Sequence, residues 1–137
     1  MESNINFQKE KKIEIKSNLA TTGKALYKIL FGILEELDMT QKELAILVNR
    51  NQTTISEWAK RKSVSVSKKM DMNDYQIFEF IDLYKSLSNF FSFKKDRIQW
   101  LREKNVGLNN QRPLDLIAED PRNLSRIKNL VNRLANP

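Results

Sequence analysis

The stretch Met39–Lys62 reads MTQKELAILVNRNQTTISEWAKRK and contains the pattern that decides the fold. Thr40 and Glu43 stand three residues apart, which is the capping-box spacing at the start of a helix. A short helix is therefore predicted to follow Thr40 and to turn its apolar side chains inward, with Ala45 small enough to let a second helix cross closely. Asn49 tolerates a left-handed backbone, so we predict that it ends this helix.

A second helix is predicted to begin near Gln52, because Ile55 and Trp58 then lie on one inward face. The spacing of these inward residues from the first helix resembles the repressor-type helix-turn-helix family, which usually has Gly where this chain has Asn49. The resemblance implies that the second helix enters the major groove of DNA. Trp58 is then expected in the core rather than stacked on a base.

The polar side chains of this stretch are candidates for DNA contact. Side chains on the outward face of the second helix suit base edges, since Gln pairs with adenine, Glu accepts from cytosine and Thr can touch a thymine methyl. The expected base-reading residues are Gln52, Thr53, Ser56 and Glu57. The expected phosphate contacts, which set position and salt dependence, are Gln41, Arg50, Lys60 and Arg61. The alternative for each of them is a solvated polar residue on a core helix.

The composition agrees with a nucleic-acid partner and argues against catalysis. The 137 residues include 24 Lys and Arg against 17 Asp and Glu, a formal charge of +7, and the excess lies at both ends of the chain around an acidic segment at 71–93. There is no Cys and no His, which excludes disulfides and Cys-bound zinc and removes the commonest general base. No Gly-rich phosphate loop is present either, so the sequence predicts no enzyme, no metal and no cofactor.

Apolar spacing predicts helices along the rest of the chain. One should run from about Thr22 to Leu37, with Gly32 inside it. Others are expected at 75–89, 94–103, 113–118 and 123–134. The fold class is therefore all-α, with an N-terminal helix-turn-helix bundle followed by a small helical module. The predicted division is an N-terminal arm at 1–20, the helix-turn-helix domain at 21–62, a linker at 63–73 and a helical domain at 74–137.

The N-terminal stretch Met1–Ser17 is polar and charged and has no continuous apolar run, unlike a secretory signal. Nowhere in the sequence is there a span of about 18 apolar residues, as a transmembrane helix would need. A cytoplasmic protein without membrane contact is expected.

A second informative stretch, Arg97–Leu116, reads RIQWLREKNVGLNNQRPLDL. Turn-forming residues and then Pro113, at a favourable first-turn position, predict a helical hairpin. The Trp-Leu pair, the Asn five residues after the Trp, and the string Arg-Pro-Leu-Asp-Leu resemble the toxin-binding domain of the Xre/MbcA/ParS antitoxins, over roughly residues 74–137. That family usually has a Gly pair where this chain has Asn109–Asn110, and further Gly residues where it has Asp120–Pro121 and Asn136–Pro137.

This resemblance implies an antitoxin that sterically neutralises a toxin encoded beside it, often a RES-fold enzyme that consumes NAD, and that represses the shared operon. A homodimer is expected as well, because a helix-turn-helix monomer reads only a half-site. The expected toxin contacts are Asn105, Leu108, Arg112, Asp115, Arg133 and Asn136.

Two alternatives stay open. Packing is the expected role of Trp100, Leu101, Pro113, Leu114 and Leu116, and a local ion pair or cap would equally explain Arg112 and Asp115. The whole chain could also be a plain transcriptional repressor whose C-terminal helices serve dimerisation only.

Overall fold

The computed structural model describes residues 22–67, 69 and 71–136, so the predicted arm at 1–20 lies outside the described residues. The predicted all-α fold class is confirmed: the described residues form helices and no strand, with one isolated bridge between Asn105 and Gln111. The first helix occupies residues 22–36. The following elements are α2 (Gln41–Leu47), α3 (Gln52–Arg61), α4 (Met72–Phe90), α5 (Lys94–Arg102), the 3₁₀ turn η1 (Val106–Leu108), α6 (Pro113–Glu119) and α7 (Asn123–Ala135).

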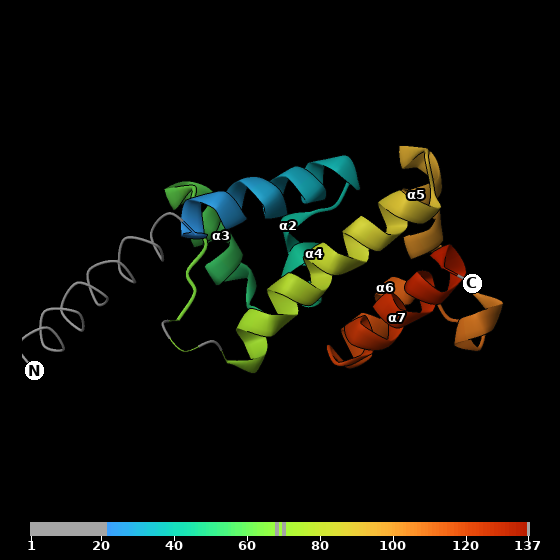
Figure 1. Ribbon diagram of the computed structural model, residues 1–137. Coiled ribbons are helices and arrows are strands. Elements are labelled where there is room, and N and C mark those ends of the chain that lie inside the picture. Colours follow the sequence, from blue (N-terminus) through green and yellow to red (C-terminus); the bar gives the residue numbers. More distant parts are fainter. Residues whose placement is uncertain (1–21, 68, 70, 137) are drawn as a thin grey trace, which may run out of the picture.

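The long helix α4 is the central element, and α2, α5 and α7 contact it (Figure 1). It begins where Asp71 caps it, accepting a hydrogen bond from the Asp74 backbone N–H at 2.9 Å, while the Asp74 carboxylate accepts from the Asp71 N–H at 3.2 Å. This second capping box starts α4 three residues before the predicted position. The apolar face of α4 is then buried from Ile77 to Leu87.

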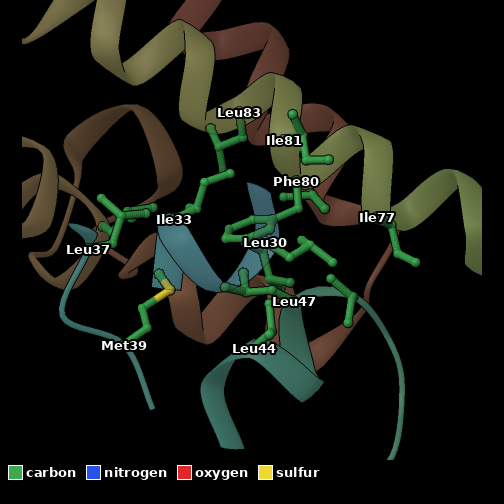
Figure 2. Packing of buried hydrophobic residues seen from close by; sticks show 14 of the residues in the cluster. Leu30, Ile33, Leu37, Met39, Leu44, Leu47, Ile77, Phe80, Ile81 and Leu83 are labelled. Carbon is green, nitrogen blue, oxygen red and sulfur yellow. The ribbon is translucent and has the colours of Figure 1, made fainter. Parts of the chain in front are cut away.

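One hydrophobic core runs through both halves of the chain. Figure 2 shows Leu30 of the first helix, Leu44 of α2 and Phe80 of α4 meeting in it, and all three are completely buried. The same cluster continues through Leu101 and Leu108 and through the buried face of α7, which is Leu124, Ile127 and Val131. The N-terminal helices, including α2 and α3, and the C-terminal helices therefore pack as one body.

Polar contacts reinforce this shared core. The Gln76 side-chain amide on α4 donates to the Leu47 carbonyl at the end of α2, at 3.1 Å, and to the Pro121 carbonyl before α7, at 2.7 Å. Farther along α4, Glu79 pairs with Lys128 of α7 at 2.8 Å. Helix α4 is thus bonded to elements on both of its sides.

The segment predicted as a linker, 63–73, makes specific contacts in its described part. Val64 is 2% exposed, and its backbone N–H donates to the Gly23 carbonyl at 3.0 Å. The Ser67 hydroxyl donates to the Asp74 carboxylate at 2.8 Å. These contacts fasten the segment to the first helix and to the start of α4.

Candidate functional site

The start of α2 has the predicted capping box. The Thr40 hydroxyl accepts from the Glu43 N–H at 3.1 Å, and the Glu43 carboxylate accepts from the Thr40 N–H at 3.0 Å. Arg102 of α5 adds two guanidinium bonds to the same carboxylate, at 2.8 and 3.1 Å. Partial burial alone would raise the pKa of Glu43, but the bonds from Arg102 and Thr40 outweigh burial and leave that pKa below its ordinary value.

The turn between α2 and α3 is set by two asparagines. Asn49 has φ 53°, the left-handed conformation predicted for it. Asn51 caps α3, its side-chain oxygen accepting from the Thr54 N–H and from the Thr54 hydroxyl, both at 2.8 Å. These local bonds fix the angle at which α3 leaves α2.

Helix α3 buries one side and exposes the other. Ile55 and Trp58 are 0% and 1% exposed, so Trp58 is a core residue as predicted. The predicted base-reading and phosphate residues Gln52, Thr53, Glu57, Lys60 and Arg61 are all exposed. Ser56 and Gln41 are half-buried and lie beside one another, with the Ser56 hydroxyl 3.5 Å from the Gln41 side-chain oxygen.

Arg50, one of the predicted phosphate contacts, is paired with a carboxylate within the fold. Its guanidinium bonds the Asp74 carboxylate of α4 at 2.9 Å, and the two side chains are only 16% and 2% exposed. The same guanidinium lies 5.9 Å from the centre of the Trp58 ring. Burial alone would raise the pKa of Asp74, but hydrogen bonds from Ser67 and the Asp71 backbone, together with the Arg50 charge, hold it below its ordinary value.

The η1 turn is built by two of the predicted toxin contacts. The Asn105 side-chain oxygen accepts from the Gly107 N–H at 2.8 Å, and Leu108 is 2% exposed in the core. Asn109 and Asn110 follow with φ 55° and 60°, as expected for residues that replace a Gly pair. The prediction that Leu108 contacts the toxin is therefore wrong, because its side chain is buried in the core, where it holds the turn in place.

Helix α6 begins at Pro113, and an exposed ion pair stands at its start. Arg112 bonds Asp115 through two guanidinium nitrogens, both at 2.8 Å. This mutual hydrogen bonding raises the pKa of Arg112 and lowers the pKa of Asp115. The pair borders a groove of about 190 Å³ between α2 and α6, whose other lining residues are Glu43, Ile46, Arg102, Leu114 and Ala118.

The tail of α7 carries the remaining predicted contacts. Arg133 and Asn136 are exposed, and the Asn136 side-chain amide donates to the Asn132 carbonyl at 3.3 Å. No group of three or more acidic, His or Cys side chains that could hold a metal ion occurs in the part of the chain that the structure describes. Among the same residues, no helix is both long and apolar enough to cross a bilayer.

Comparisons with known proteins bear on the C-terminal half. Residues 89–136 match the family model for the antitoxin Xre/MbcA/ParS C-terminal toxin-binding domain. The fold is similar to a chain in the crystal structure of the M. tuberculosis MbcT-MbcA toxin-antitoxin complex, with a TM-score of 0.58 and 19% sequence identity, covering 80% of this chain and 93% of that chain. No curated protein sequence matches the chain.

The resemblance to the Xre/MbcA/ParS antitoxins is thereby confirmed. Residues 89–136 match the toxin-binding domain of this family, and most of the chain shares the fold of a chain in a toxin-antitoxin complex. The structural similarity extends beyond that domain, because it covers most of the chain, including part of the helix-turn-helix half.

Several residues that shape these surfaces carry no local signal in the sequence. Arg102 and Asp74 bond residues that lie 59 and 24 positions away, and such pairs follow only from the packing of the helices. Val106, between two residues singled out from the sequence, is 87% exposed. The only sequence feature that indicates this exposure is the position of Val106 next to Gly107, within a segment rich in turn-forming residues.

Proposed function

We propose that this antitoxin binds and sterically neutralises a toxin encoded beside it and binds operator DNA to repress their shared operon. The observation that carries the proposal is the joining of a toxin-binding domain, residues 89–136, to a helix-turn-helix whose second helix, α3, presents an open polar face. In this account the chain has no catalytic activity and needs no cofactor.

The resemblance to the Xre/MbcA/ParS antitoxins favours a RES-fold toxin that consumes NAD. The antitoxin would then neutralise the toxin sterically, by binding over its surface, and would not react with it. We retain four of the predicted contact residues, because they are exposed: Arg112, Asp115, Arg133 and Asn136. Asn105 contributes by shaping the η1 turn.

The DNA-reading surface that we propose lies on α3 and the start of α2. Gln52, Thr53 and Glu57 would meet base edges, while Lys60 and Arg61 would meet phosphates. Gln41 and Ser56, which support one another, lie beside this face. A homodimer would place two copies of α3 on the half-sites of a palindromic operator.

The toxin half of the proposal is tested by co-expression. The product of the adjacent reading frame should arrest growth when it is expressed alone, and simultaneous expression of this chain should restore growth. A neighbour that is harmless alone would instead favour the plain repressor with dimerising C-terminal helices.

The DNA half is tested by three substitutions on α3, measured by binding to the promoter of its own operon and to unrelated DNA. Gln52→Ala and Glu57→Ala should change the preferred operator sequence, each by about 1–3 kcal/mol at the affected base pair. Lys60→Ala should weaken binding to all DNA alike and reduce its salt dependence. Equal loss on every sequence for all three variants would contradict the assignment of base-reading residues.

A further inference from the structure

The η1 turn holds an apolar side chain out in solvent. Val106 is 87% exposed, whereas Leu108, two residues on, is buried in the core. The turn is closed on both sides, by the Asn105 N–H bonding the Gln111 carbonyl at 3.1 Å and the Asn110 N–H bonding the Asn105 carbonyl at 2.9 Å. Val106 therefore projects from a fixed turn rather than from a loose loop.

The η1 turn lies against helix α7. A Cβ added to Gly107 would lie 3.8 Å from the Leu130 side chain, which places the turn against the middle of that helix. One helical turn away on either side are Arg126 and Leu134, at the i−4 and i+4 positions that share a face with Leu130. Leu130 is half-buried and Leu134 is 42% exposed, so the face of α7 that lies beside the turn is also apolar.

Cations border this apolar strip. Arg126 and Arg133 are exposed, and neither forms an ion pair within the described ranges. Lys128, by contrast, is paired with Glu79, and Arg122 with Asp120. An apolar centre with an arginine rim is the composition of a protein-binding patch.

We propose that Val106, Leu130 and Leu134, with Arg126 and Arg133 at their edge, form the face that docks the toxin, and that the toxin presents an apolar socket bordered by carboxylates. This inference rests on the proposed function, since it names the surface and the chemistry of the same partner. All five residues belong to the segment that matches the toxin-binding domain, 89–136.

Two other occupants fit this face less well. A second copy of the chain, docked face to face about a two-fold axis, would enclose four unpaired arginines in one interface that supplies no carboxylates from this face. Operator DNA would have to reach α7 while it engages α3, but the two helices lie well apart in Figure 1. An acidic protein partner would supply charges opposite to the arginines and would not need to reach α3.

The test measures the affinity of full-length chain for the purified product of the adjacent reading frame, by calorimetry at low and high salt. Val106→Asp should weaken binding at least about tenfold, because a carboxylate would be buried in the socket at the centre of the contact. Arg126→Glu and Arg133→Glu should each weaken binding about fivefold or more at low salt and lessen its salt dependence. The variants should unfold at the wild-type temperature, since all three side chains are exposed.

Two control variants introduce the same kinds of charge change at exposed positions outside this face. Met72→Asp alters another apolar side chain, 78% exposed at the start of α4, and Arg61→Glu alters an exposed arginine on α3. Both should leave toxin affinity unchanged. Wild-type affinity in Val106→Asp and Arg126→Glu would overturn this inference alone, and so would a change in oligomeric state caused by Val106→Asp. Failure of the wild-type chain to bind the neighbouring product would overturn the proposed function as well.

Discussion

In this protein, asparagines adopt the left-handed backbone conformation that glycine adopts in many other proteins. Among the described residues, five other than glycine have a left-handed backbone, and three of these are the asparagines at 49, 109 and 110. None of the described glycines has a positive φ. Since Asn is the residue after Gly that best tolerates this conformation, the turns after α2 and η1 could be predicted from the sequence. Asp38 also has positive φ, and Asp shares this tolerance, whereas Lys62 has positive φ without any such signal in its residue type.

Two glycines of the first helix differ in the space available for an added methyl group, and this difference gives a prediction. At Gly32, inside the first helix, an added Cβ would meet nothing within 4 Å. Gly32→Ala should therefore raise the free energy of unfolding by about 0.5–1 kcal/mol, because Ala loses less backbone entropy in a helix. The measurement is urea denaturation followed by circular dichroism.

Gly23→Ala is the matched comparison in the same helix. A Cβ there would lie 2.7 Å from the Val64 carbonyl oxygen and 2.7 Å from the Ser63 hydroxyl, so the backbone contact after α3 would have to move. This variant should be less stable than the wild-type protein. Equal shifts in the two variants would contradict the different packing of the two positions.

At the scale of helices, the ends that carry local caps are the ones that the sequence predicts well. The capping box at Thr40 and the proline at 113 mark the starts of α2 and α6 where they are observed. The predicted start of α4 is three residues too late, because apolar spacing begins at Tyr75, whereas the cap of the helix is made by two aspartates, Asp71 and Asp74. Local hydrogen bonds are visible in a sequence only when their residue types match a known pattern.

The cap of α2 gives a prediction for this element. Thr40→Ala removes the hydroxyl that accepts from the Glu43 N–H, and should lower the free energy of unfolding by about 1 kcal/mol. Thr53→Ala, an exposed position inside the first turn of α3, is the control and should change stability by less than about 0.5 kcal/mol. A similar loss in both variants, by urea denaturation, would show that the capping bond does not stabilise α2.

Across the whole molecule, ion pairs between distant segments join the N-terminal helices and the α2–α3 turn to α4 and α5. Arg102 of α5 bonds the cap of α2, Arg97 of α5 bonds Glu36 of the first helix at 2.6 Å, and Arg50 bonds Asp74 of α4. None of these pairs could be predicted from sequence, because they depend on how the helices pack. Arg50 shows the consequence: its charge alone predicts a phosphate contact, whereas its pairing with the buried Asp74 carboxylate follows only from the packing.

The buried pair gives a prediction with a pH dependence. Asp74→Asn should lower the free energy of unfolding at pH 7 by roughly 3 kcal/mol, because it leaves the Arg50 guanidinium largely buried without a counter-charge. The folded-state pKa of Asp74 is lowered, so its contribution is fully present above the ordinary carboxyl pKa and is lost as the pH falls through the folded value. The stability gap between variant and wild type should therefore narrow below about pH 4.

Asp82→Asn on the same helix is the control, since Asp82 is exposed and should contribute little at any pH. Denaturant midpoints measured from pH 3 to pH 7 provide the comparison. A gap between the Asp74 variant and wild type that stays constant over this range would contradict a carboxylate stabilised by its partners.

The central claim is that one rigid chain binds DNA through α3 and a toxin through its C-terminal domain, at surfaces that lie apart in the fold (Figure 1). The most direct measurement is the affinity of two variants for both partners, Lys60→Ala on α3 and Val106→Asp on η1. We expect Lys60→Ala to weaken operator binding and to leave binding of the adjacent gene product intact, and we expect Val106→Asp to do the reverse. Loss of both activities in both folded variants would contradict it.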